Sequence, residues 1–275
     1  MKKIICLVAG LIISVSFIFA QMNTAVTQIM WGEGNTTVQE QVGSMNFSHI
    51  DIYRCSNDNM VTTMQGAYKN NARIKIGPYA ENNNVNILQN VLSGVHPELD
   101  GFNRAGVRIY GADDNSVLID QSGRLNKAFV NTSSYDSESN TTMQIQKGLK
   151  NLSNIFIEFK SYDNVVETYQ GGFGNIALVN LYDSKENHIS IKQNLGTPFD
   201  HQPDMNLAEV EICNGMGNID DIIQEGKCNE AFVRQVGDWN SATIMQNGYA
   251  HHGIIIQKGC RNSSTIIQRD GLFCK

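Results

Sequence analysis

The chain has 275 residues, a formal net charge of −6 and a hydrophobic content of 41%, with 24 Gly and only 4 Pro. Few aromatic residues (8%) and many Gly, Asn, Gln and Ser residues are typical of short strands joined by tight turns, and they argue against a helical bundle. The acidic balance argues against nucleic acid as a partner, because phosphate contacts depend on an excess of Lys and Arg.

The first segment, residues 1–20, has the three parts of a secretory signal peptide: two lysines after Met1, an apolar run over 4–19, and the small residue Ala20. We expect cleavage after Ala20. A membrane anchor is the weaker interpretation, because the apolar run is short for a span and no basic cluster follows it. We expect the mature protein to be secreted. Removal of the segment takes both lysines with it and changes the formal net charge from −6 to −8.

Residues 21–34 form a short lead-in, and a repeated unit then runs over 35–275. We call each copy an arm and number its residues from 0. Position 0 is usually Asn, position 2 is small and position 4 is Ile or Val. Arms come in pairs of about 22–25 residues: position 6 tends to be Gln in the first arm, and Ile, Leu or Thr in the second. Up to the last quarter, the first arms begin at Asn35, Asn59, Asn83, Asn115, Asn140, Asn164 and Asn187.

Two insertions interrupt the pairs, at about 92–102 and 196–205. Each falls between the first and the second arm of a pair, and the second holds two prolines. We expect both to be surface loops on one regular object without a domain boundary.

The last quarter of the chain carries the clearest copies, with like residues every eleven positions. Periodicity this strict indicates a repeat architecture. The predicted assembly ladder consists of amide residues at positions 0 and 6: Asn218, Gln224, Asn229, Gln235, Asn240, Gln246, Gln257, Asn262 and Gln268. The predicted core consists of aliphatic residues at position 4: Ile222, Val233, Ile244, Ile255 and Ile266. The predicted turn residues stand two positions after Gln: Gly226, Gly237, Gly248 and Gly259.

The even spacing of the marked positions predicts strands, because alternate residues of a strand point to the same face. Asn, the small residue, the aliphatic residue and Gln therefore face inward. The variable residues, such as Glu230 and Arg234, face outward. Gly accepts positive φ freely and Asn tolerates it better than most residues, so Gly and the following Asn suit a tight reversal.

Stacking the strand–turn–strand pairs predicts an all-β fold, a two-sided β-solenoid of about ten rungs with a cross-β, amyloid-like arrangement. At ~4.8 Å per rung it would be on the order of 50 Å long. Like residues lie above like residues, so the aliphatic positions form a dry column that contributes roughly 1.5–3 kcal/mol per side chain. Inward amides satisfy one another along the axis as Asn and Gln ladders.

The final arm, 262–268, keeps the consensus, whereas terminal repeats of solenoids usually depart from it to act as caps. An uncapped end exposes a row of unpaired backbone groups. We therefore expect 240–268 to be the growing or docking surface. The more degenerate N-terminal arms leave that end less defined.

Other patterns have plainer interpretations. Asp220 occupies an inward position usually held by Ala, and we interpret it as a gatekeeper that slows stacking. His251, which could ligate a metal together with His252, fills a position 0. The pair Asp113–Asp114 and the glycines of 171–174 fall in turns, and no Lys-Ser/Thr follows those glycines. We expect no catalytic, cofactor or metal site.

Five cysteines remain after the signal segment, an odd number that leaves at least one thiol free or intermolecular. Their spacing contains no Cys-x-x-Cys and matches no zinc pattern, so we interpret them as turn residues, with room for one bridge. They are Cys55, Cys213, Cys228, Cys260 and Cys274.

The array resembles curlin, the subunit of bacterial curli amyloid fibres, whose repeat is roughly Ser/Asn-x5-Gln-x-Gly-x2-Asn-x-Ala-x3-Gln. Residues 218–235 match every marked position of this repeat. Residues 240–257 match except for His251 in place of Asn and Gly253 in place of Ala. The resemblance is tight in the last quarter and looser over the rest of the mature chain.

The resemblance implies a secreted, extracellular fibre at the surface of a Gram-negative bacterium, serving cell adhesion and biofilm matrix. The implied partners are other copies of the chain, a second curlin-like subunit, and an outer-membrane secretion pore with accessory proteins. The chain departs from the family in its length, its cysteines, its two insertions and the lack of a long Gly-rich leader. Its irregular first half suits a minor or nucleating subunit.

Two other functions compete with a fibre subunit. A monomeric secreted β-solenoid binding module, for polysaccharide, ice or another surface, would favour a flat outward face with regular Thr or aromatic residues, but positions 1, 3 and 5 are irregular. A parallel β-helix enzyme acting on polysaccharide needs longer coils and a carboxylate cluster, and this unit has two short strands per rung.

Overall fold

The computed structural model describes residues 22–90, 101–133, 137–195 and 204–270. The expected signal peptide, Cys274 and most of both insertions lie outside these residues. The described chain consists of strands and turns without a helix, and so contains no helix that could span a membrane.

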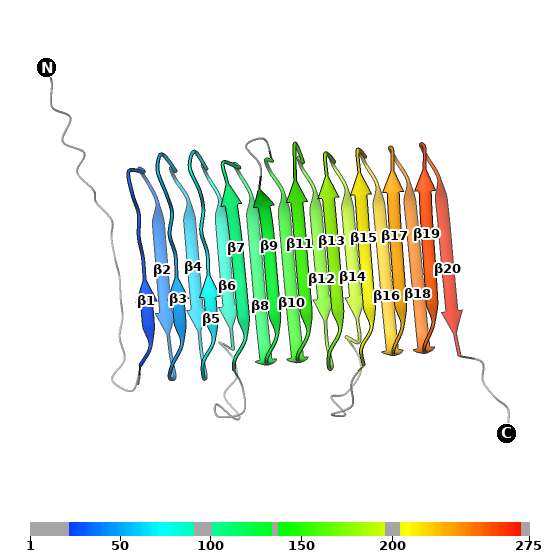
Figure 1. The fold of residues 1–275 in the computed structure, drawn as a ribbon, viewed down its shortest axis with the longest axis horizontal. Coiled ribbons are helices and arrows are strands. Elements are labelled where there is room, and N and C mark those ends of the chain that lie inside the picture. Colours follow the sequence, from blue (N-terminus) through cyan, green and yellow to red (C-terminus); the bar gives the residue numbers. More distant parts are fainter. Residues whose placement is uncertain (1–21, 91–100, 134–136, 196–203, 271–275) are drawn as a thin grey trace, which may run out of the picture.

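Twenty strands form two parallel sheets of ten, and the chain alternates between them (Figure 1). We call the sheet of even-numbered strands sheet A and the sheet of odd-numbered strands sheet B. The strands are β1 (Thr24–Val26), β2 (Thr36–Gln41), β3 (Phe47–His49), β4 (Met60–Gln65), β5 (Asn71–Arg73), β6 (Asn84–Gln89), β7 (Arg104–Tyr110), β8 (Ser116–Arg124), β9 (Lys127–Ser133), β10 (Thr141–Leu149), β11 (Leu152–Glu158), β12 (Val165–Gln170), β13 (Ile176–Tyr182), β14 (His188–Gln193), β15 (Leu207–Cys213), β16 (Ile219–Lys227), β17 (Glu230–Val236), β18 (Ser241–Tyr249), β19 (His252–Lys258) and β20 (Ser263–Arg269).

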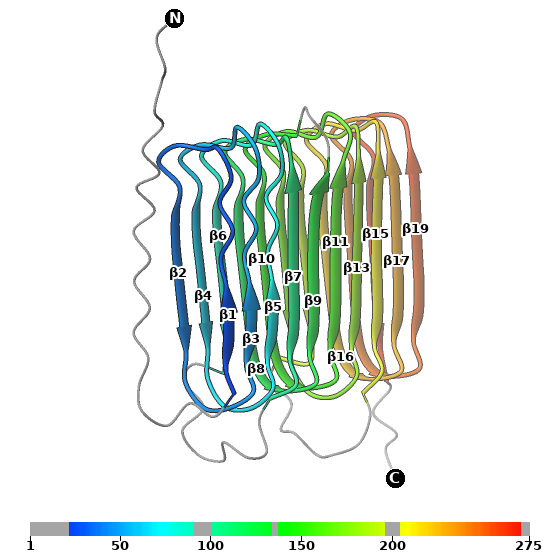
Figure 2. The ribbon, with the colours of Figure 1, turned by 60° about the vertical axis from the view of Figure 1, so that its left-hand side comes forward.

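The two sheets lie face to face, and the chain winds from one to the other at each turn (Figure 2). Each strand pairs in parallel with the strand two further along the chain, so successive rungs are stacked rather than meandering. The predicted all-β, two-sided β-solenoid is therefore confirmed.

The register places like residues above like residues. Ile222 lies beside Ile244 and Gln224 beside Gln246 in the pairing of β16 with β18. The same alignment continues from β18 to β20. A shift by one residue would turn every inward side chain outward, so the inward pattern fixes this register.

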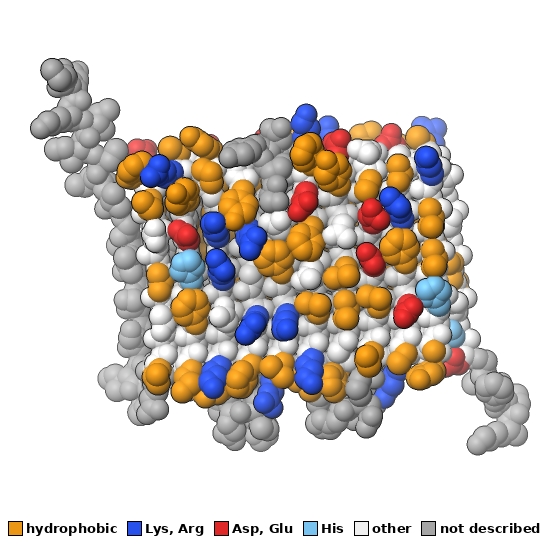
Figure 3. Space-filling model, viewed as in Figure 1, with side chains coloured by type: hydrophobic (Ala, Val, Ile, Leu, Met, Phe, Trp, Pro, Cys, Tyr) orange, Lys and Arg blue, Asp and Glu red, His pale blue; other side chains and the backbone are white. Residues whose placement is uncertain are grey.

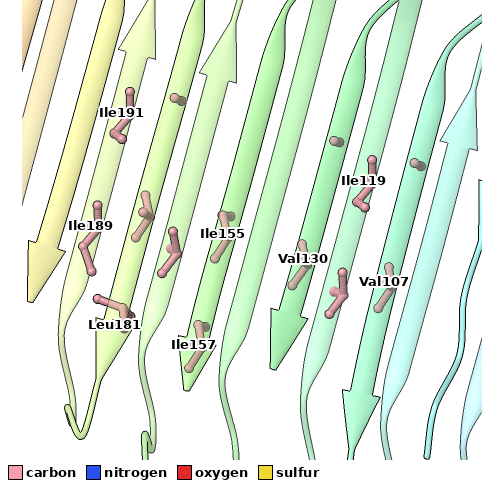
Figure 4. Packing of buried hydrophobic residues seen from close by; sticks show 14 of the residues in the cluster. Val107, Ile119, Val130, Ile155, Ile157, Leu181, Ile189 and Ile191 are labelled. Atoms are coloured by element: carbon pink, nitrogen blue, oxygen red, sulfur yellow. The ribbon is translucent and has the colours of Figure 1, made fainter. Parts of the chain in front are cut away.

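The core is the narrow space between the sheets, filled by aliphatic side chains from positions 2 and 4 and, in sheet B, position 6 (Figure 4). Ile119 of sheet A and Val107, Val130 and Ile155 of sheet B all belong to this cluster and are at most 1% exposed. Fully burying such a side chain contributes roughly 1.5–3 kcal/mol. The cluster runs continuously along the solenoid axis, so each rung depends on its neighbours for most of its burial.

The turns differ from expectation in one respect. The predicted turn glycines do have positive φ, from 98° at Gly226 to 133° at Gly248. The expectation that the Asn at position 0 shares this conformation is wrong. The left-handed residue is the one just before it, whatever its type, as at Cys228 (58°) and Trp239 (57°). Asn serves the turn through its side chain instead.

The glycines are required because the rungs are stacked so closely. A Cβ atom added at Gly226 would lie 2.1 Å from the backbone oxygen of Gly248 in the next rung. A Cβ atom at Gly237 would lie 2.4 Å from the corresponding oxygen of Gly259. Only Gly combines this φ with so close an approach of two backbones.

Candidate functional site

A continuous ladder of glutamine side chains runs through sheet A. The Nε2 of each Gln donates a hydrogen bond to the Oε1 of the Gln in the next rung, as between Gln224 and Gln246 (2.9 Å) and between Gln246 and Gln268 (2.8 Å). The second Nε2 proton goes to a backbone carbonyl of sheet B, such as that of Leu207 for Gln224 (2.9 Å). Both amide protons are satisfied, so burying these groups carries little desolvation cost.

Asparagines at position 0 form a second kind of ladder with the opposite direction. The backbone N–H of Asn240 donates to the Oδ1 of Asn218 one rung earlier (2.8 Å). Asn262 donates to the Oδ1 of Asn240 with both its backbone N–H (3.1 Å) and its Nδ2 (2.8 Å). The side-chain oxygen of each Asn therefore accepts a hydrogen bond from the backbone N–H at the start of the strand in the next rung.

The structure places the predicted ladder and core residues as follows. Seven of the nine predicted ladder amides are buried, and Asn262 and Gln268 on the last strand are the more exposed two. Ile222, Val233, Ile244 and Ile255 are buried in the core, and Ile266 is partly buried against it. Gln235 and Gln257 pair with each other in sheet B (2.8 Å). A role of these residues in joining separate subunits stays a prediction.

The Gln ladder is longer than the predicted site, because it continues through the earlier rungs. Gln41 donates to Gln65 and Gln65 to Gln89, each at 2.8 Å. The same chain of bonds passes through 121, 146, 170 and 193 to Gln224. The signal was present in the sequence, since each of these residues stands six positions after an Asn.

Two further amides mark the rungs from which the insertions leave. Asn90 and Asn194 follow the ladder glutamines directly, and each accepts a hydrogen bond from a glycine N–H of the next rung, Gly123 and Gly226 respectively, at 2.8 Å. Sequence reasoning missed this pair, although Gln-Asn precedes both insertions; the dipeptide alone is not diagnostic, since Gln246 is also followed by an Asn.

Hydroxyl and amide groups replace aliphatic side chains at some inward positions. The hydroxyl oxygens of Ser48 and Thr63 lie 2.8 Å apart across the core, and those of Ser153 and Thr168 lie 2.7 Å apart in the same way. Gln144 donates to the Ser153 hydroxyl (2.9 Å). These polar groups face one another between the sheets. A polar residue is therefore accommodated at an inward position where the register places a polar partner opposite it.

Asp220 is the exception among the inward residues. It is 0% exposed, with Ile189 and Ala242 as its register neighbours, and neither carboxylate oxygen has a hydrogen-bond partner within the described chain. Burial raises the pKa of this carboxyl well above its ordinary value, because desolvation penalises the charged form. Its inward orientation is as expected, and its action as a gatekeeper stays a prediction.

The remaining predicted features have structural explanations. His251 takes position 0, where its backbone N–H donates to Asn229 Oδ1 (3.1 Å) and its Nε2 lies 3.2 Å from Asp270. Within the described residues no group of three His, Cys, Asp or Glu is placed to hold a metal. Cys55, Cys213, Cys228 and Cys260 are free thiols; Cys213, the last residue of β15, donates to Glu211 (3.5 Å) rather than lying in a turn.

The two ends of the solenoid are complementary. β1 belongs to sheet B and β20 to sheet A, so the described chain begins with a half-turn on one side and ends with a half-turn on the other (Figure 1). Within the described residues, β20 pairs only with β18, and β1 only with β3. Backbone groups on the outer edges of both strands are therefore unpaired among these residues.

The ladders give each end a chemical direction. Gln268 Nε2 bonds to the His252 carbonyl (2.9 Å) and has a second proton with no partner within the described chain. At the other end, Gln41 Oε1 accepts no hydrogen bond from a described residue. The Asn ladder shows the reverse, because Asn262 Oδ1 accepts no hydrogen bond from a described residue.

Fold and ladders together define a parallel, two-sheet β-solenoid whose rungs are joined by inward amides. The family model described as the curlin associated repeat matches residues 221–248 and 228–259. This match supports a curlin-family assignment through the last rungs, where the resemblance is tightest. No curated protein matches the chain significantly. The repeat and the solenoid fit a curlin-like fibre protein.

Proposed function

We propose that the chain is a secreted subunit of a curli-like amyloid fibre that assembles by stacking strand edges end to end. The observation that carries the proposal is the complementarity of the ends. A second copy placed beyond β20 would continue sheet A with its β2 and sheet B with its β1, without a change in winding. Such a heterologous contact does not close on itself, so it generates a filament.

The ladders specify the direction of stacking. When the C-terminal end meets the N-terminal end of another copy, the free Nε2 proton of Gln268 faces the free Oε1 of Gln41. Contact between two C-terminal ends would place donor against donor in the Gln ladder. Mismatched polar groups at a buried contact cost about 1–3 kcal/mol each, so the fibre is expected to be polar.

The family match supports an extracellular location at the bacterial surface, with roles in adhesion and biofilm matrix. A signal peptide over 1–20, export through an outer-membrane pore with accessory proteins, and co-assembly with a second curlin-like subunit belong to the same proposal. The short N-terminal strands leave β1 with only three residues, and this asymmetry suits a minor or nucleating subunit.

The first test is assembly of purified residues 21–275. We expect thioflavin-T fluorescence to rise after a lag, seeds to shorten the lag, and electron microscopy to show fibres. A protein that stays monomeric for days, with and without seeds, would contradict the proposal and leave a monomeric binding module as the function.

A second test uses the edge geometry of β20. Asn262 directs its carbonyl to Ser241 of β18 (2.8 Å), and residues alternate along a parallel strand, so the N–H of Thr265 points to the free edge. Thr265→Pro removes that N–H without removing a bond to β18. We expect the variant to remain folded and, when added in less than equimolar amount to the wild-type protein, to stop fibre growth. Thr265→Ala is the matched control and should assemble at the wild-type rate.

A further inference from the structure

The outward face of sheet B contains a basic hollow of about 500 Å³ over β5, β7, β9 and β11. We define the basic hollow by its central residues, which come from three neighbouring rungs: Arg73, Arg104, Gly106, Arg108, Lys127 and Phe129. All four cations are exposed. Figure 3 shows Lys and Arg side chains next to hydrophobic ones on this part of the face.

The hollow exists because Gly106 has no side chain at an outward position. In the register of β7 and β9, Gly106 lies beside Phe129 and Arg104 beside Lys127. The Phe129 ring leans over Gly106 so closely that a Cβ atom there would lie 3.1 Å from the ring. The floor of the hollow is therefore an aromatic surface, and the cations form its rim.

The rim cations have no acidic partner among the residues that the structure describes. Arg73, Arg104, Arg108 and Lys127 make no ion pair with any described residue, whereas the ion pairs that do occur, such as Arg234 with Glu211, lie in the last rungs. Arg108 is placed over the Phe129 ring at 5.5 Å. Four unpaired cations around one hollow repel one another, and an anion would relieve that repulsion.

Charge is divided along this face of an otherwise acidic protein. The net charge is −6, yet the cations gather over the first half of the solenoid and the acidic side chains of the face lie mainly towards the C-terminal rungs (Figure 3). Glu209, Glu211 and Glu230 are outward residues of β15 and β17. A local positive field on an acidic molecule points to a specific anionic partner rather than to general polyanion binding.

We propose that the basic hollow binds an anionic polysaccharide. Arg guanidinium groups bind carboxylate or sulfate oxygens in pairs, and the exposed face of Phe129 offers an apolar surface to the C–H face of a sugar ring. The hollow extends over four strands, so it spans roughly 15 Å along the axis and accommodates several linked sugars. Nucleic acid is less favoured, because the acidic remainder of the protein repels a uniform polyphosphate.

In a fibre, the basic hollow would recur once per subunit, and one polysaccharide chain would contact several copies. This step rests on the proposed function. Binding of one chain to several linked sites raises the overall affinity by a factor on the order of 10²–10⁴, although each single site is unchanged. The fibre would then hold matrix polysaccharide along its length.

The experiment measures binding of alginate, a polyuronate, and of heparin, a sulfated polysaccharide, to freshly purified monomer and separately to fibres. The test variant is Arg104→Gln with Arg108→Gln. The matched control is Lys147→Gln with Lys192→Gln, which removes the same charge from the outward face of sheet A. We expect the test variant to weaken monomer binding at least about tenfold and the control by less than about twofold.

Two further arms separate the alternatives. Phe129→Ala keeps every charge and should still weaken polysaccharide binding several-fold, whereas it should hardly change binding of inorganic sulfate. Equal losses in the test and control variants would overturn the proposal, and so would tighter binding of duplex DNA than of either polysaccharide. Circular dichroism of each variant checks the fold, and monomer binding is measured whether or not fibres form, so the result does not depend on assembly.

Discussion

The first and last rungs of the solenoid are built from the same arm with different regularity. Between β16 and β20, like residues lie 22 positions apart and the strands have seven or nine residues. Between β2 and β6 the separation is 24, and the intervening strands β3 and β5 have only three residues each.

The two extra residues of each early rung lie in the turn after its second arm. That turn contains two left-handed non-glycine residues, Tyr79 (63°) and Asn82 (53°), where the equivalent late turn contains Arg261 (59°) as its one such residue. Ile74 and Ile76 precede this wide turn and fall outside β5, yet both are 0% exposed.

The comparison shows that the inward side chains, rather than the length of the strands, determine how each rung is stacked on the next. The Gln ladder has bonds of 2.8 Å between Gln41 and Gln65 in the irregular region, and of 2.8 Å between Gln246 and Gln268 in the regular one. The backbones approach closely in both regions, since an added Cβ atom would lie 2.0 Å from the Ala67 oxygen at Gly43 and 2.1 Å from the Gly248 oxygen at Gly226. Four predictions separate these contributions, in order of expected effect.

The largest effect is expected at the close backbone approach of the regular turns. Gly226→Ala combines φ of 98° with a Cβ atom 2.1 Å from the Gly248 oxygen, and we expect a loss of about 3 kcal/mol in the free energy of unfolding. Denaturant titration of the monomer measures it.

Gly253→Ala is the internal control. This glycine occupies an inward position usually held by Ala, its φ is not positive, and the nearest atom to an added Cβ is a side-chain carbon of Ile244 at 3.2 Å. We expect a change within about 1 kcal/mol. Equal losses in the two variants would show that turn geometry does not distinguish these glycines.

The second prediction compares the same ladder position in both regions. Gln65→Ala and Gln246→Ala each remove one donor and one acceptor from the ladder, which leaves one Nε2 proton and one Oε1 of the neighbouring glutamines unpaired. We expect each to cost about 2 kcal/mol and to slow fibre growth. Glu230→Ala, an outward control, should have little effect on either. A loss confined to Gln246→Ala would mean that the irregular rungs do not depend on their ladder.

The third prediction concerns the buried charge of the regular region. The pKa of Asp220 is raised by burial, so the folded state retains a proton that the unfolded state releases above about pH 4. The contribution of this carboxyl to stability is therefore fully present below that pH, and it falls by about 1.4 kcal/mol per pH unit as the pH rises towards the folded-state pKa.

Asp220→Asn should remove this slope, since the amide does not ionise. The difference between the wild-type and Asp220→Asn unfolding curves over pH 3–8 isolates the contribution of this carboxyl. The inward neighbours on β14, β15, β17 and β18 include no titratable group; the nearest charged residues of these strands, such as Lys192 and Arg234, face outward. Parallel curves for the two proteins would show that the carboxyl is solvated.

The smallest effect is expected at the outward ion pair of Arg234 with Glu211 (3.4 Å). The Arg234 side chain is 48% exposed and the Glu211 side chain 30%, and such pairs contribute about 0.2–1 kcal/mol. Arg234→Ala should change stability by less than about 0.5 kcal/mol, and 1 M salt should reduce the change further. A loss comparable with that of Gln246→Ala would overturn the view that the outward residues contribute little.

The sequence was sufficient for the fold because one period encodes strand, register and inward face together. Ile222, Gln224 and Gly226 lie where their spacing predicts, since the two-residue repeat of a strand allows no other register without exposing the core. The edge of β20, unpaired among the described residues, could be anticipated because the final arm keeps the consensus where a cap would depart from it.

Other features depend on neighbours that the period does not encode. The left-handed conformation falls on Trp239 and Arg261 because of the hydrogen bonding of the turn, and neither residue type indicates it. The basic hollow brings together Arg73, Gly106 and Phe129 from three rungs, and an insertion separates the first from the others in sequence. Outward positions carry no repeat, so only the stacked register shows which of them become neighbours.

The opposed hydrogen bonding of the two ladders has an electrostatic consequence for length. In the Gln ladder the N–H that joins one Gln to the next points towards the C-terminal end, as in Gln224 to Gln246. In the Asn ladder the backbone N–H groups of Asn240 and Asn262 point towards the N-terminal end. The two rows of amide dipoles oppose each other along the axis, and parallel strands add little net dipole of their own. Adding a rung therefore increases the axial dipole of the ladders less than it would in a stack whose amide rows all pointed the same way.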